Sequence, residues 1–580
     1  MKNDENLLEI EDLKVHFDLR QGRLHAVKGV NLSIKPGEVL GVVGESGSGK
    51  SLTARAILNL MPRSAQTSGS VRFRGRGGEV SILDQGRESK TMRELRGGQI
   101  GMIFQEPMTA LSPVHSIGQQ VMRTLTLHTD LRKAALTDRA AELMDLVGLP
   151  DPRGMLDKYP HQLSGGMRQR AMIAMALSCN PSLLLADEPT TALDVTTEAQ
   201  ILDLIRDLQE RFNMGVLFIT HNFGVVAELA DRMLVMNHGD VVETGGVDDI
   251  FYAPKDPYTQ RLLSLIPRLP ETSMADNRDD TTPAQAAAPV EAPVSDPVLT
   301  VKGLKMHFPT AKDWRGRTTQ VLKAVDDVSF TIGRGETFGL VGESGSGKST
   351  VARSVLRAYE PTGGSVQFRA PDGATHELTT MTGDTLRGMR RHMQMVFQDP
   401  YSSLNPRMTV EQLIGEPMVN QGETNSNQIR DRAAELLVQV GLQPDMLSRY
   451  PHAFSGGQRQ RVGIARALVT NPSFVVLDES VSALDVSIAA QTINLLKELQ
   501  ENLGLTYLFI THDLSMVANF ADRIGVMQKG KLVETGDTGA FFANPQDPYS
   551  QRLLNAVPIP DPRRARALRE RRAALAGNAA

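Results

Sequence analysis

The sequence predicts an α/β protein in which one kind of domain occurs twice. GVVGESGSGKS at 41–51 recurs as GLVGESGSGKS at 339–349, and YPHQLSGGMRQR at 159–170 recurs as YPHAFSGGQRQR at 450–461. The motifs keep their order in both halves, at offsets of 298 and 291 residues. These offsets are far longer than any solenoid repeat, so they indicate duplication of a whole domain. Within each half, short β-rich runs alternate with helical patterns, as in an α/β domain.

Individual elements of this fold can be placed from the pattern in the first half. Glu38–Gly44 is expected to be a strand that leads into a glycine-rich loop, and Lys50–Leu60 the helix that follows. Ser182–Glu188 and Gly215–His221 are almost continuously apolar, which predicts buried parallel strands. From about residue 106 to 180 longer helical patterns prevail, which indicates a helical insertion into the α/β core.

Composition limits the classes of function. The chain has 580 residues, 41% of them hydrophobic and 22% charged, as expected for several globular domains. A formal charge of −4 argues against binding to nucleic acid through bulk positive charge. The one cysteine, Cys179, excludes an internal disulfide and any zinc or iron–sulfur site built from cysteines of this chain alone, and fits a reducing cytosol. No apolar run approaches the ~18–20 residues that span a bilayer, and MKNDENLLEI has no signal-peptide core.

Two segments outside the repeated motifs have distinctive compositions. The stretch between the halves is rich in Ala, Pro, Asp and Thr, which favours a flexible linker. The Arg- and Ala-rich end of the chain favours a solvated, partly helical tail, with contact to an anionic membrane surface as the alternative. The expected organisation is a first domain at 7–250, its C-terminal extension at 251–270, the linker at 271–297, a second domain at 298–540, its extension at 541–560, and a basic tail at 561–580.

The glycine-rich loops match the pattern GxxxxGK[ST] in both halves. Glycines let a backbone wrap closely around phosphate, and the following helix adds its positive N-terminal end. Lys50 and Lys348 are expected to reach the β- and γ-phosphates, and Ser51 and Ser349 to bind Mg²⁺. The alternative, a plain glycine turn, does not explain two matches between strand and helix. The expected phosphate-binding residues are Gly44, Glu45, Ser46, Gly47, Ser48, Gly49, Lys50, Ser51, Leu52, Gly342, Glu343, Ser344, Gly345, Ser346, Gly347, Lys348, Ser349 and Thr350.

Two acidic residues end a buried strand in each half. A carboxylate at the carboxyl end of such a strand faces the ligand crevice of an α/β sheet. Asp187 and Asp478 are therefore expected to hold Mg²⁺ through water. Glu188 and Glu479 are expected to polarise the attacking water as general bases. Taken alone, such a pair could equally be solvated loop acids, but here each pair follows a phosphate loop.

Further polar residues recur at the ends of apolar runs. Gln105 and Gln398 could orient water or Mg²⁺ and sense the γ-phosphate. His221 and His512 follow LFIT and could contact the γ-phosphate, although a lone histidine there is usually structural. Ser-Gly-Gly before a helix provides an N-cap and a surface for close approach, with a plain helix start as the alternative. These residues are Ser164, Gly165 and Gly166 in the first half and Ser455, Gly456, Gly457 and Gln458 in the second.

This set of motifs resembles the ATP-binding cassette (ABC) family of ATPases over nearly the whole chain, twice. The resemblance implies two tandem nucleotide-binding domains, each with a RecA-like core, an antiparallel β subdomain and a helical subdomain. It also implies a head-to-tail pair, in which Ser164, Gly165 and Gly166 cap the nucleotide held by the second phosphate loop. Ser455, Gly456 and Gly457 would cap the nucleotide of the first loop. The family's adenine-stacking aromatics correspond best to Phe17 and Phe308, which could instead belong to the core.

The sequence departs from the family pattern at three positions. Met167 replaces the usual glutamine of the Ser-Gly-Gly motif, Asn222 the usual aspartate after the histidine, and Ser480 the usual proline after the glutamate. None of these changes removes a phosphate, metal or base group. Both sites are therefore expected to be chemically complete, with ATP and Mg²⁺ bound at each.

A closer resemblance suggests the biological task. APKDPYTQRLLSLIP at 253–267 recurs as NPQDPYSQRLLNAVP at 544–558, and FQEPMTALSP and FQDPYSSLNP follow the two glutamines where the family docks membrane subunits. These segments resemble the fused ATPases of dipeptide, oligopeptide and glutathione importers, although the two PY segments could be simple packing elements. An iron–sulfur cluster found in some relatives is not expected here, because the chain has one cysteine.

The importer resemblance implies partners and a location. Two transmembrane permease subunits and an extracytoplasmic solute-binding protein would work with this chain, and no nucleic acid would be bound. The chain would lie peripherally on the cytoplasmic face of a bacterial inner membrane, its two halves paired with each other. The rival hypothesis is a tandem ATPase that acts on ribosomes or in DNA repair. The short Ala/Pro-rich linker and the lack of zinc cysteines disfavour it.

Overall fold

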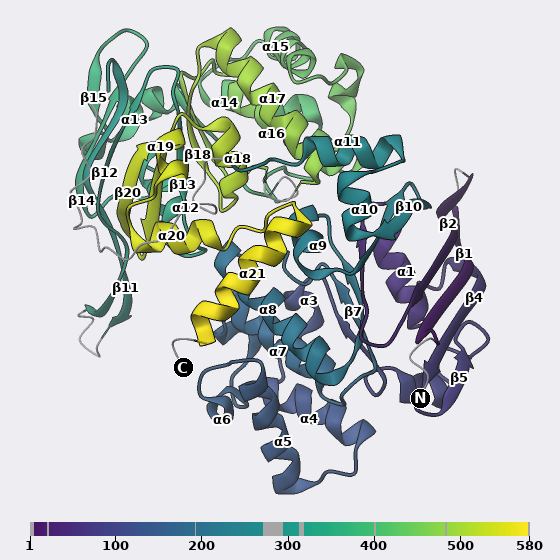
Figure 1. The fold of residues 1–580 in the computed structure, drawn as a ribbon. Helices are drawn as coiled ribbons and strands as arrows, with labels where there is room; N and C mark the ends of the chain where they lie inside the picture. Colours follow the sequence, from purple (N-terminus) through teal and green to yellow (C-terminus); the bar gives the residue numbers. More distant parts are fainter. Residues whose placement is uncertain are drawn as a thin grey trace. The chain divides into compact units, whose positions relative to one another are not determined.

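The computed structural model describes residues 5–19, 22–191, 193–270, 294–312, 318–399, 402–481 and 484–577. The chain forms two compact units (Figure 1). Unit 1 consists of Met1–Leu193, Thr197–Ile266 and Pro558–Ala580, and unit 2 of Asp194–Thr196 and Pro267–Val557. Most of the predicted linker, at 271–293, lies outside the described residues.

Unit 1 contains two sheets. An antiparallel sheet has the strand order β2-β1-β4-β5, and a mixed, six-stranded sheet has the order β10-β9-β3-β8-β7-β6. In the second sheet only the β9–β10 pair is antiparallel. The strands are β1 (Leu8–Leu19), β2 (Gly22–Ile34), β3 (Val39–Val43), β4 (Ala65–Gly75), β5 (Gly78–Ser81), β6 (Ile100–Ile103), β7 (Leu183–Asp187), β8 (Gly215–Ile219), β9 (Arg232–Asn237) and β10 (Asp240–Gly246).

The predicted buried strands are confirmed. Every residue of β3, β7 and β8 is buried, which explains the unbroken apolar sequences VLGVV, LLLAD and GVLFI. The helix predicted over Lys50–Leu60 is α1 (Lys50–Ile57), which ends three residues early. The reason is Asn59, whose φ of 49° lies in the left-handed region and cannot continue a helix.

The helical insertion predicted for the first half is present. Between β6 and β7 the chain forms five α-helices and one 3₁₀ helix, which enclose an apolar core of Leu, Ile, Val, Met and Ala side chains. Including this insertion, the helices of unit 1 are α1, α2 (Lys90–Leu95), α3 (Pro107–Ala110), α4 (Ile117–His128), α5 (Lys133–Leu146), α6 (Pro152–Met155), η1 (Pro160–Gln162), α7 (Gly165–Leu177), α8 (Val195–Phe212), α9 (Phe223–Leu229), α10 (Val247–Tyr252), α11 (Pro257–Leu265) and α21 (Pro562–Gly577).

Unit 2 repeats this architecture. Its sheets have the orders β12-β11-β14-β15 and β16-β17-β18-β13-β19-β20. The strands are β11 (Pro297–Lys312), β12 (Thr318–Gly333), β13 (Thr337–Val341), β14 (Gly363–Arg369), β15 (Thr375–Glu377), β16 (Met393–Val396), β17 (Phe474–Asp478), β18 (Thr506–Ile510), β19 (Arg523–Gln528) and β20 (Lys531–Asp537). The helices are α12 (Lys348–Val355), η2 (Leu378–Thr380), α13 (Gly383–Arg390), α14 (Val410–Asn420), α15 (Ser426–Gln439), η3 (Pro444–Ser448), η4 (Pro451–Ala453), α16 (Gly456–Leu468), α17 (Val486–Leu503), α18 (Leu514–Phe520), α19 (Thr538–Ala543) and α20 (Pro548–Asn555).

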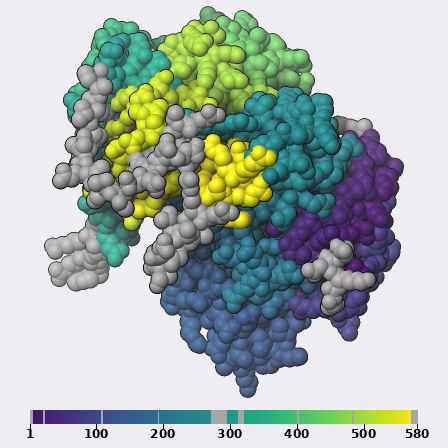
Figure 2. All heavy atoms as spheres, viewed as in Figure 1, coloured from purple at the N-terminus to yellow at the C-terminus, as the bar shows by residue number. Residues whose placement is uncertain are grey.

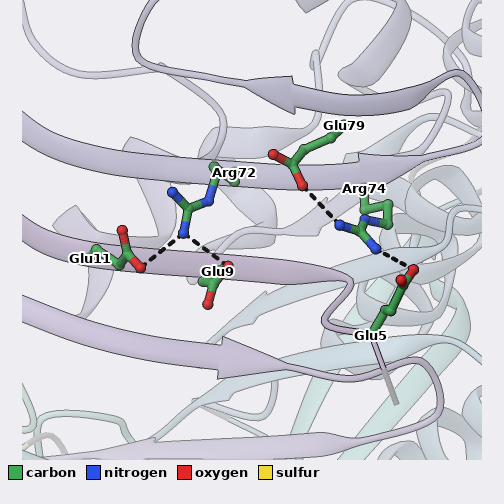
Figure 3. Close-up of polar contacts among 6 residues, drawn as sticks. All are labelled: Glu5, Glu9, Glu11, Arg72, Arg74 and Glu79. Atoms are coloured by element: carbon green, nitrogen blue, oxygen red, sulfur yellow. Dashed lines mark hydrogen bonds and ion pairs between the residues drawn. The ribbon is translucent and has the colours of Figure 1, made fainter. Parts of the chain in front are cut away.

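The antiparallel sheet of unit 1 carries a ladder of ion pairs on its solvent face. Arg72 bridges Glu9 and Glu11 at 3.0 and 2.8 Å, and Arg74 contacts Glu5 and Glu79 (Figure 3). All of these side chains are at least one-third exposed, so each pair contributes little to stability. Opposite charges on neighbouring strands instead favour the observed register of β1, β4 and β5 over like-charge pairings.

The C-terminal basic segment is helical, as predicted, but it is not wholly solvated. It forms α21, and this helix belongs to unit 1, where Pro562 and Ala565 are buried. Within the described part of the chain, none of the helices has the length and apolar character needed to cross a membrane.

Candidate functional site

The first phosphate loop connects β3 to α1 in unit 1. Gly44, Gly47 and Gly49 have φ angles of 151°, 80° and 99°. Residues other than glycine rarely adopt these angles. A Cβ on Gly44 would lie 2.2 Å from the carbonyl oxygen of Met236, so this position also leaves no room for a side chain. The loop is thus a tight backbone cradle, as the pattern predicts.

Lys50 begins α1 and is 5% exposed. Its ammonium group donates to the carbonyl oxygens of Gly44 and Glu45, at 2.6 and 2.9 Å. These bonds hold the positive charge inside the loop, at the N-terminus of the helix. Charge and helix dipole together make this position suitable for an anion such as a nucleotide phosphate.

The predicted acid pair lies next to this loop. Asp187 is the last residue of β7, and its Oδ1 accepts a hydrogen bond of 2.8 Å from the Ser51 hydroxyl. Burial raises the pKa of Asp187, opposed by the Ser51 hydrogen bond. The structure therefore brings together the two oxygen side chains that the sequence assigns to a metal.

Glu188 has an unusual backbone and a crowded carboxylate. Its φ is 47°, and its N–H donates to the carbonyl oxygen of Ile219 on β8 at 2.9 Å. Strained conformations of this kind occur at functional sites. Glu188 Oε2 accepts from Gln105 Nε2 at 2.9 Å and lies 3.5 Å from His221 Nδ1. Burial opposes ionisation, but the hydrogen bond and charge of His221 outweigh it and lower the pKa of Glu188 to about 2.

Thr191 is a site residue that the sequence interpretation missed. Its hydroxyl donates to Glu188 Oε2 at 2.9 Å, so a third side chain stabilises the ionised carboxylate. A signal was available, because both halves carry a hydroxyl residue three positions after the glutamate: Thr191 and Ser482. Ser482 lies outside the described residues.

Unit 2 contains the same arrangement. Lys348 donates to the carbonyl oxygens of Gly342 and Glu343 at 2.7 and 2.9 Å, and Ser349 donates to Asp478 Oδ1 at 2.9 Å. The remaining glycines of this loop, Gly345 and Gly347, have φ angles of 79° and 108°. Burial lowers the pKa of Lys348, opposed by nearby carboxylates that include Glu479 and Asp478.

The glutamine and histidine partners of Glu188 recur around the glutamate of unit 2. Glu479, with φ of 46°, accepts from Gln398 Nε2 at 2.6 Å and lies 3.6 Å from His512 Nδ1. Burial of His512 disfavours its charged form, but the hydrogen bond and charge of Glu479 outweigh burial and raise the pKa of His512. This pair stabilises unit 2 fully below the ordinary histidine pKa and loses that contribution as the pH rises through the raised value.

We expect that Glu479→Gln lowers the pKa of His512, because a neutral amide no longer stabilises the imidazolium. The pKa is measured from the histidine ring protons by nuclear magnetic resonance, in the metal-free and nucleotide-free protein. Glu188→Gln, the same change in unit 1, is the control and leaves the His512 titration unchanged. An unaltered His512 pKa in Glu479→Gln contradicts the ion pair.

The two Ser-Gly-Gly motifs begin helices, as predicted. Ser164 caps α7 by accepting from the N–H of Met167, and Ser455 caps α16 by accepting from the N–H of Gln458, both at 3.3 Å. A Cβ on the second glycine would clash, at 2.7 Å from Thr197 for Gly166 and 2.6 Å from Ile488 for Gly457. A Cβ on the first glycine, Gly165 or Gly456, would meet no atom closer than 4 Å. The second glycine of each motif thus packs against its own unit. The first glycine leaves space beside it that a ligand could approach closely.

The two caps differ because Met167 stands where unit 2 has Gln458. Gln458 Oε1 accepts from the Ser455 N–H at 3.1 Å and completes a capping box, whereas Met167 packs against the apolar core. We expect Gln458→Met to destabilise unit 2 by about 0.5–1 kcal/mol in chemical denaturation. Gln458→Glu retains the accepting oxygen and should restore the stability. Equal losses in both variants would assign the effect to packing.

The two candidate adenine aromatics are half-buried. Phe17 packs against the core beneath the antiparallel sheet of unit 1. Phe308 has the same place in unit 2, with its ring 5.6 Å from that of Tyr359 in an edge-on arrangement. Their stacking on a base remains a prediction, since a half-buried ring fits both roles.

The residues present fit a nucleotide with a divalent cation. In the phosphate loop of unit 2, the Ser346 hydroxyl is buried and has no hydrogen-bond partner among the residues that the structure describes. A buried hydroxyl of this kind is expected where a bound ligand supplies the hydrogen-bond partner. The donor sets Ser51 with Asp187, and Ser349 with Asp478, contain only oxygen, which suits Mg²⁺.

Comparison with known proteins agrees with this chemistry. The family model "ABC transporter" matches residues 27–191 and 325–482, and the model "Oligopeptide/dipeptide transporter, C-terminal region" matches 242–291 and 533–579. Two ATP-binding cassettes are therefore present. The chain belongs to the ABC transporter family of ATPases.

Several relatives match almost end to end. Proteins named "Glutathione import ATP-binding protein GsiA" from Pectobacterium atrosepticum and Escherichia coli K12 are each 46% identical, with 97% of this chain and 91% of the relative covered. Among solved structures, the ATP-binding cassette MJ0796 bound to ADP and Pi is 28% identical, with 41% of this chain and 98% of that chain covered and a TM-score of 0.37. CbiO1 from Clostridium perfringens is also 28% identical, over 43% of this chain and 93% of its own, with a TM-score of 0.37.

Proposed function

We propose that this chain is the ATP-hydrolysing subunit of a bacterial importer for peptides, with glutathione as the first solute to test. The observation that carries the proposal is the combination of the same serine–aspartate arrangement beside the phosphate loop of each unit with 46% identity to proteins named for glutathione import. The match of both C-terminal extensions to the oligopeptide/dipeptide transporter model supports the peptide class.

The side chains of each site would have distinct roles in hydrolysis. Lys50 and Lys348 bind phosphate oxygens, and the carboxylates of Glu188 and Glu479 accept a proton from the attacking water. The glutamate is already ionised, because its partners keep the pKa low. His221 lies close enough to orient that carboxylate. Mg²⁺, held by the serine and aspartate of each site, would neutralise phosphate charge.

Nucleotide binding would pair the two halves. The open face of Gly165 suits it to cover the nucleotide at Lys348, and Gly456 to cover the one at Lys50. Closure and reopening of the pair would drive alternating access in two permease subunits. An extracytoplasmic binding protein would deliver the solute, and the chain would work on the cytoplasmic face of the inner membrane.

A groove in unit 2 supports contact with a permease. A cavity of about 590 Å³ lies between β16, α14 and α16, and Phe397, the residue before Gln398, is among those that line it. Phe397 and Leu404 give it an apolar part, and Arg390 and Arg459 line it, while Arg466 pairs with Glu416 at 2.7 Å. A short amphipathic helix with acidic residues, on the cytoplasmic side of a permease, matches this combination.

The proposal is tested by purification and transport. The tagged chain, extracted in detergent from its native cells, is expected to bring with it two hydrophobic permease subunits. Proteoliposomes of this complex with the binding protein should take up labelled glutathione or dipeptides only when ATP is supplied on the side of this chain. Recovery with ribosomes or DNA instead of permeases would favour the rival function, and uptake of neither solute would refute the peptide class.

A further inference from the structure

The end of the chain packs on unit 1, although the rest of the second half lies in unit 2. Unit 2 ends at Val557, and the residues from Pro558 onwards belong to unit 1. Helix α21 packs against α9 and α10 of that unit (Figure 1). Figure 2 shows the C-terminal residues in yellow on the surface of the molecule. Side chains are described up to residue 569, and we call residues 558–569 the C-terminal clasp.

Polar contacts hold the clasp to α10. Arg566 donates to both carboxylate oxygens of Asp248, at 2.5 and 2.7 Å. The Tyr252 hydroxyl donates to Asp561 at 2.5 Å, and the guanidinium of Arg563 lies 4.3 Å from the centre of the Tyr252 ring. Burial opposes ionisation of Asp561, but the hydrogen bonds from Tyr252 and two backbone N–H groups lower its pKa. The contacts are therefore mutually supporting, unlike an isolated surface ion pair.

Close packing holds the clasp to α9. A Cβ on Gly224, the second residue of α9, would lie 2.8 Å from the carbonyl oxygen of Pro558 and 3.0 Å from its Cβ. The backbone of the clasp therefore passes over a position where only glycine fits. Pro562 and Ala565 of the clasp are also buried.

The sequence of the first half is adapted to this contact, and that of the second half is not. The repeat aligns α9 and α10 with α18 and α19 at an offset of 291 residues. The three residues that receive the clasp are all replaced at the corresponding positions: Gly224 by Ser515, Asp248 by Gly539, and Tyr252 by Ala543. Unit 2 receives the corresponding segment of the first half at α18, where Asn519 Nδ2 donates to the Arg268 carbonyl oxygen at 3.2 Å, but it lacks the three residues that receive the clasp on unit 1.

We propose that the C-terminal clasp holds α9 and positions His221 in the first ATPase site. The N-cap of α9 is Asn222, whose side chain accepts from the N–H of Gly224 at 2.9 Å. His221 directly precedes this cap and lies 3.5 Å from Glu188. The close contact between Pro558 and Gly224 therefore restricts the backbone of α9 three residues after His221. The role of His221 rests on the proposed ATPase mechanism, whereas the clasp itself rests on the contacts alone.

A cross-linking experiment tests the contact. Asp248→Cys with Arg566→Cys, in a Cys179→Ala background, should be joined by a short bismaleimide within one chain, as shown by mass spectrometry of linked peptides. The matched control replaces Asp248→Cys by Gly539→Cys, its counterpart in unit 2, and should give no link. Equal linking of both pairs, linking between separate chains, or no link at all would overturn the clasp. This result does not depend on ATP hydrolysis or on any transported solute.

Turnover at the first site alone tests the positioning. In the purified full chain with Glu479→Gln, which silences the second site, Gly224→Ser should lower kcat roughly tenfold, because a small misplacement of a catalytic group is costly. KM for ATP should be unchanged, since the phosphate loop is untouched. Ser515→Gly, the reverse change in unit 2, is the control and leaves the first site unaffected.

A chain that ends at Val557 provides the second variant. It should show the same loss of first-site kcat, and a synthetic peptide of residues 558–577 should restore it. With Glu188→Gln in place of Glu479→Gln, turnover at the second site should be the same with and without the clasp. Unchanged first-site kcat in both Gly224→Ser and the truncated chain, or equal losses at the two sites, would overturn the positioning role.

Discussion

Replacing Glu188 and Glu479 together by glutamine is expected to lower ATP hydrolysis by about two to four decades, the usual scale for losing a general base. Glutamine has nearly the same size and can still contact Gln105 and Gln398, so the fold of the sites should persist. It cannot accept the proton of water as a carboxylate does. Binding of ATP should therefore be retained, and the measurements are steady-state phosphate release and equilibrium binding of a fluorescent nucleotide.

The single variants sharpen this result. Glu188→Gln and Glu479→Gln each leave one intact site, so the single variants report how turnover is divided between the halves. Glu142→Gln removes a carboxylate that pairs with Arg139 on an exposed part of α5, and this control should hydrolyse ATP at the normal rate. Hydrolysis at the normal rate in the double variant would remove both glutamates from the role of base.

The features that could be predicted from the sequence are those encoded within a few consecutive residues. The loop around Lys50 and the Asp187–Glu188 pair each combine a buried strand with a fixed spacing, so pattern and chemistry coincide. The structure then brings Ser51 of the phosphate loop to Asp187, and it brings Gln105 and His221 to Glu188, as the strand-end positions of Gln105 and His221 indicated. Parallel strands make this convergence almost obligatory, because their carboxyl ends meet at one edge of the sheet.

Other features could not be predicted because they depend on tertiary contacts. The positive φ of Glu188 arises where its N–H bonds to the neighbouring strand, and no local residue preference signals it. The binding of α21 to unit 1 joins residues more than 300 positions apart through Asp248 and Arg566. Polar surface contacts have no periodic pattern, so the composition of the Arg-rich tail predicts a solvated, partly helical segment. One signal was present in the sequence: Gly224 of the first half corresponds to Ser515 in the second, a difference that indicates a close contact at this position in the first half.

Substitution of Gly44 by alanine is expected to have the largest effect on the stability of unit 1. The φ of 151° costs an alanine roughly 1–2 kcal/mol, as a left-handed conformation does. A Cβ 2.2 Å from the carbonyl oxygen of Met236 adds an overpacking cost of about 1–3 kcal/mol, because that oxygen belongs to β9 and cannot move without the sheet. Loss of about 3 kcal/mol or more should appear in denaturation followed by hydrogen exchange of unit 1, together with loss of ATP binding at this site.

Gly47→Ala separates the two causes within the same loop. Gly47 also has a positive φ, 80°, but a Cβ there would meet no atom within 4 Å. Only the backbone cost of about 1–2 kcal/mol should therefore remain. Unit 2 repeats the comparison, because a Cβ on Gly342 would lie 2.2 Å from the Met527 carbonyl oxygen while one on Gly345 meets nothing. If the two alanine substitutions in each loop destabilise the protein equally, the contact with the neighbouring strand does not require glycine. The backbone conformation alone would then explain the glycines of the loop.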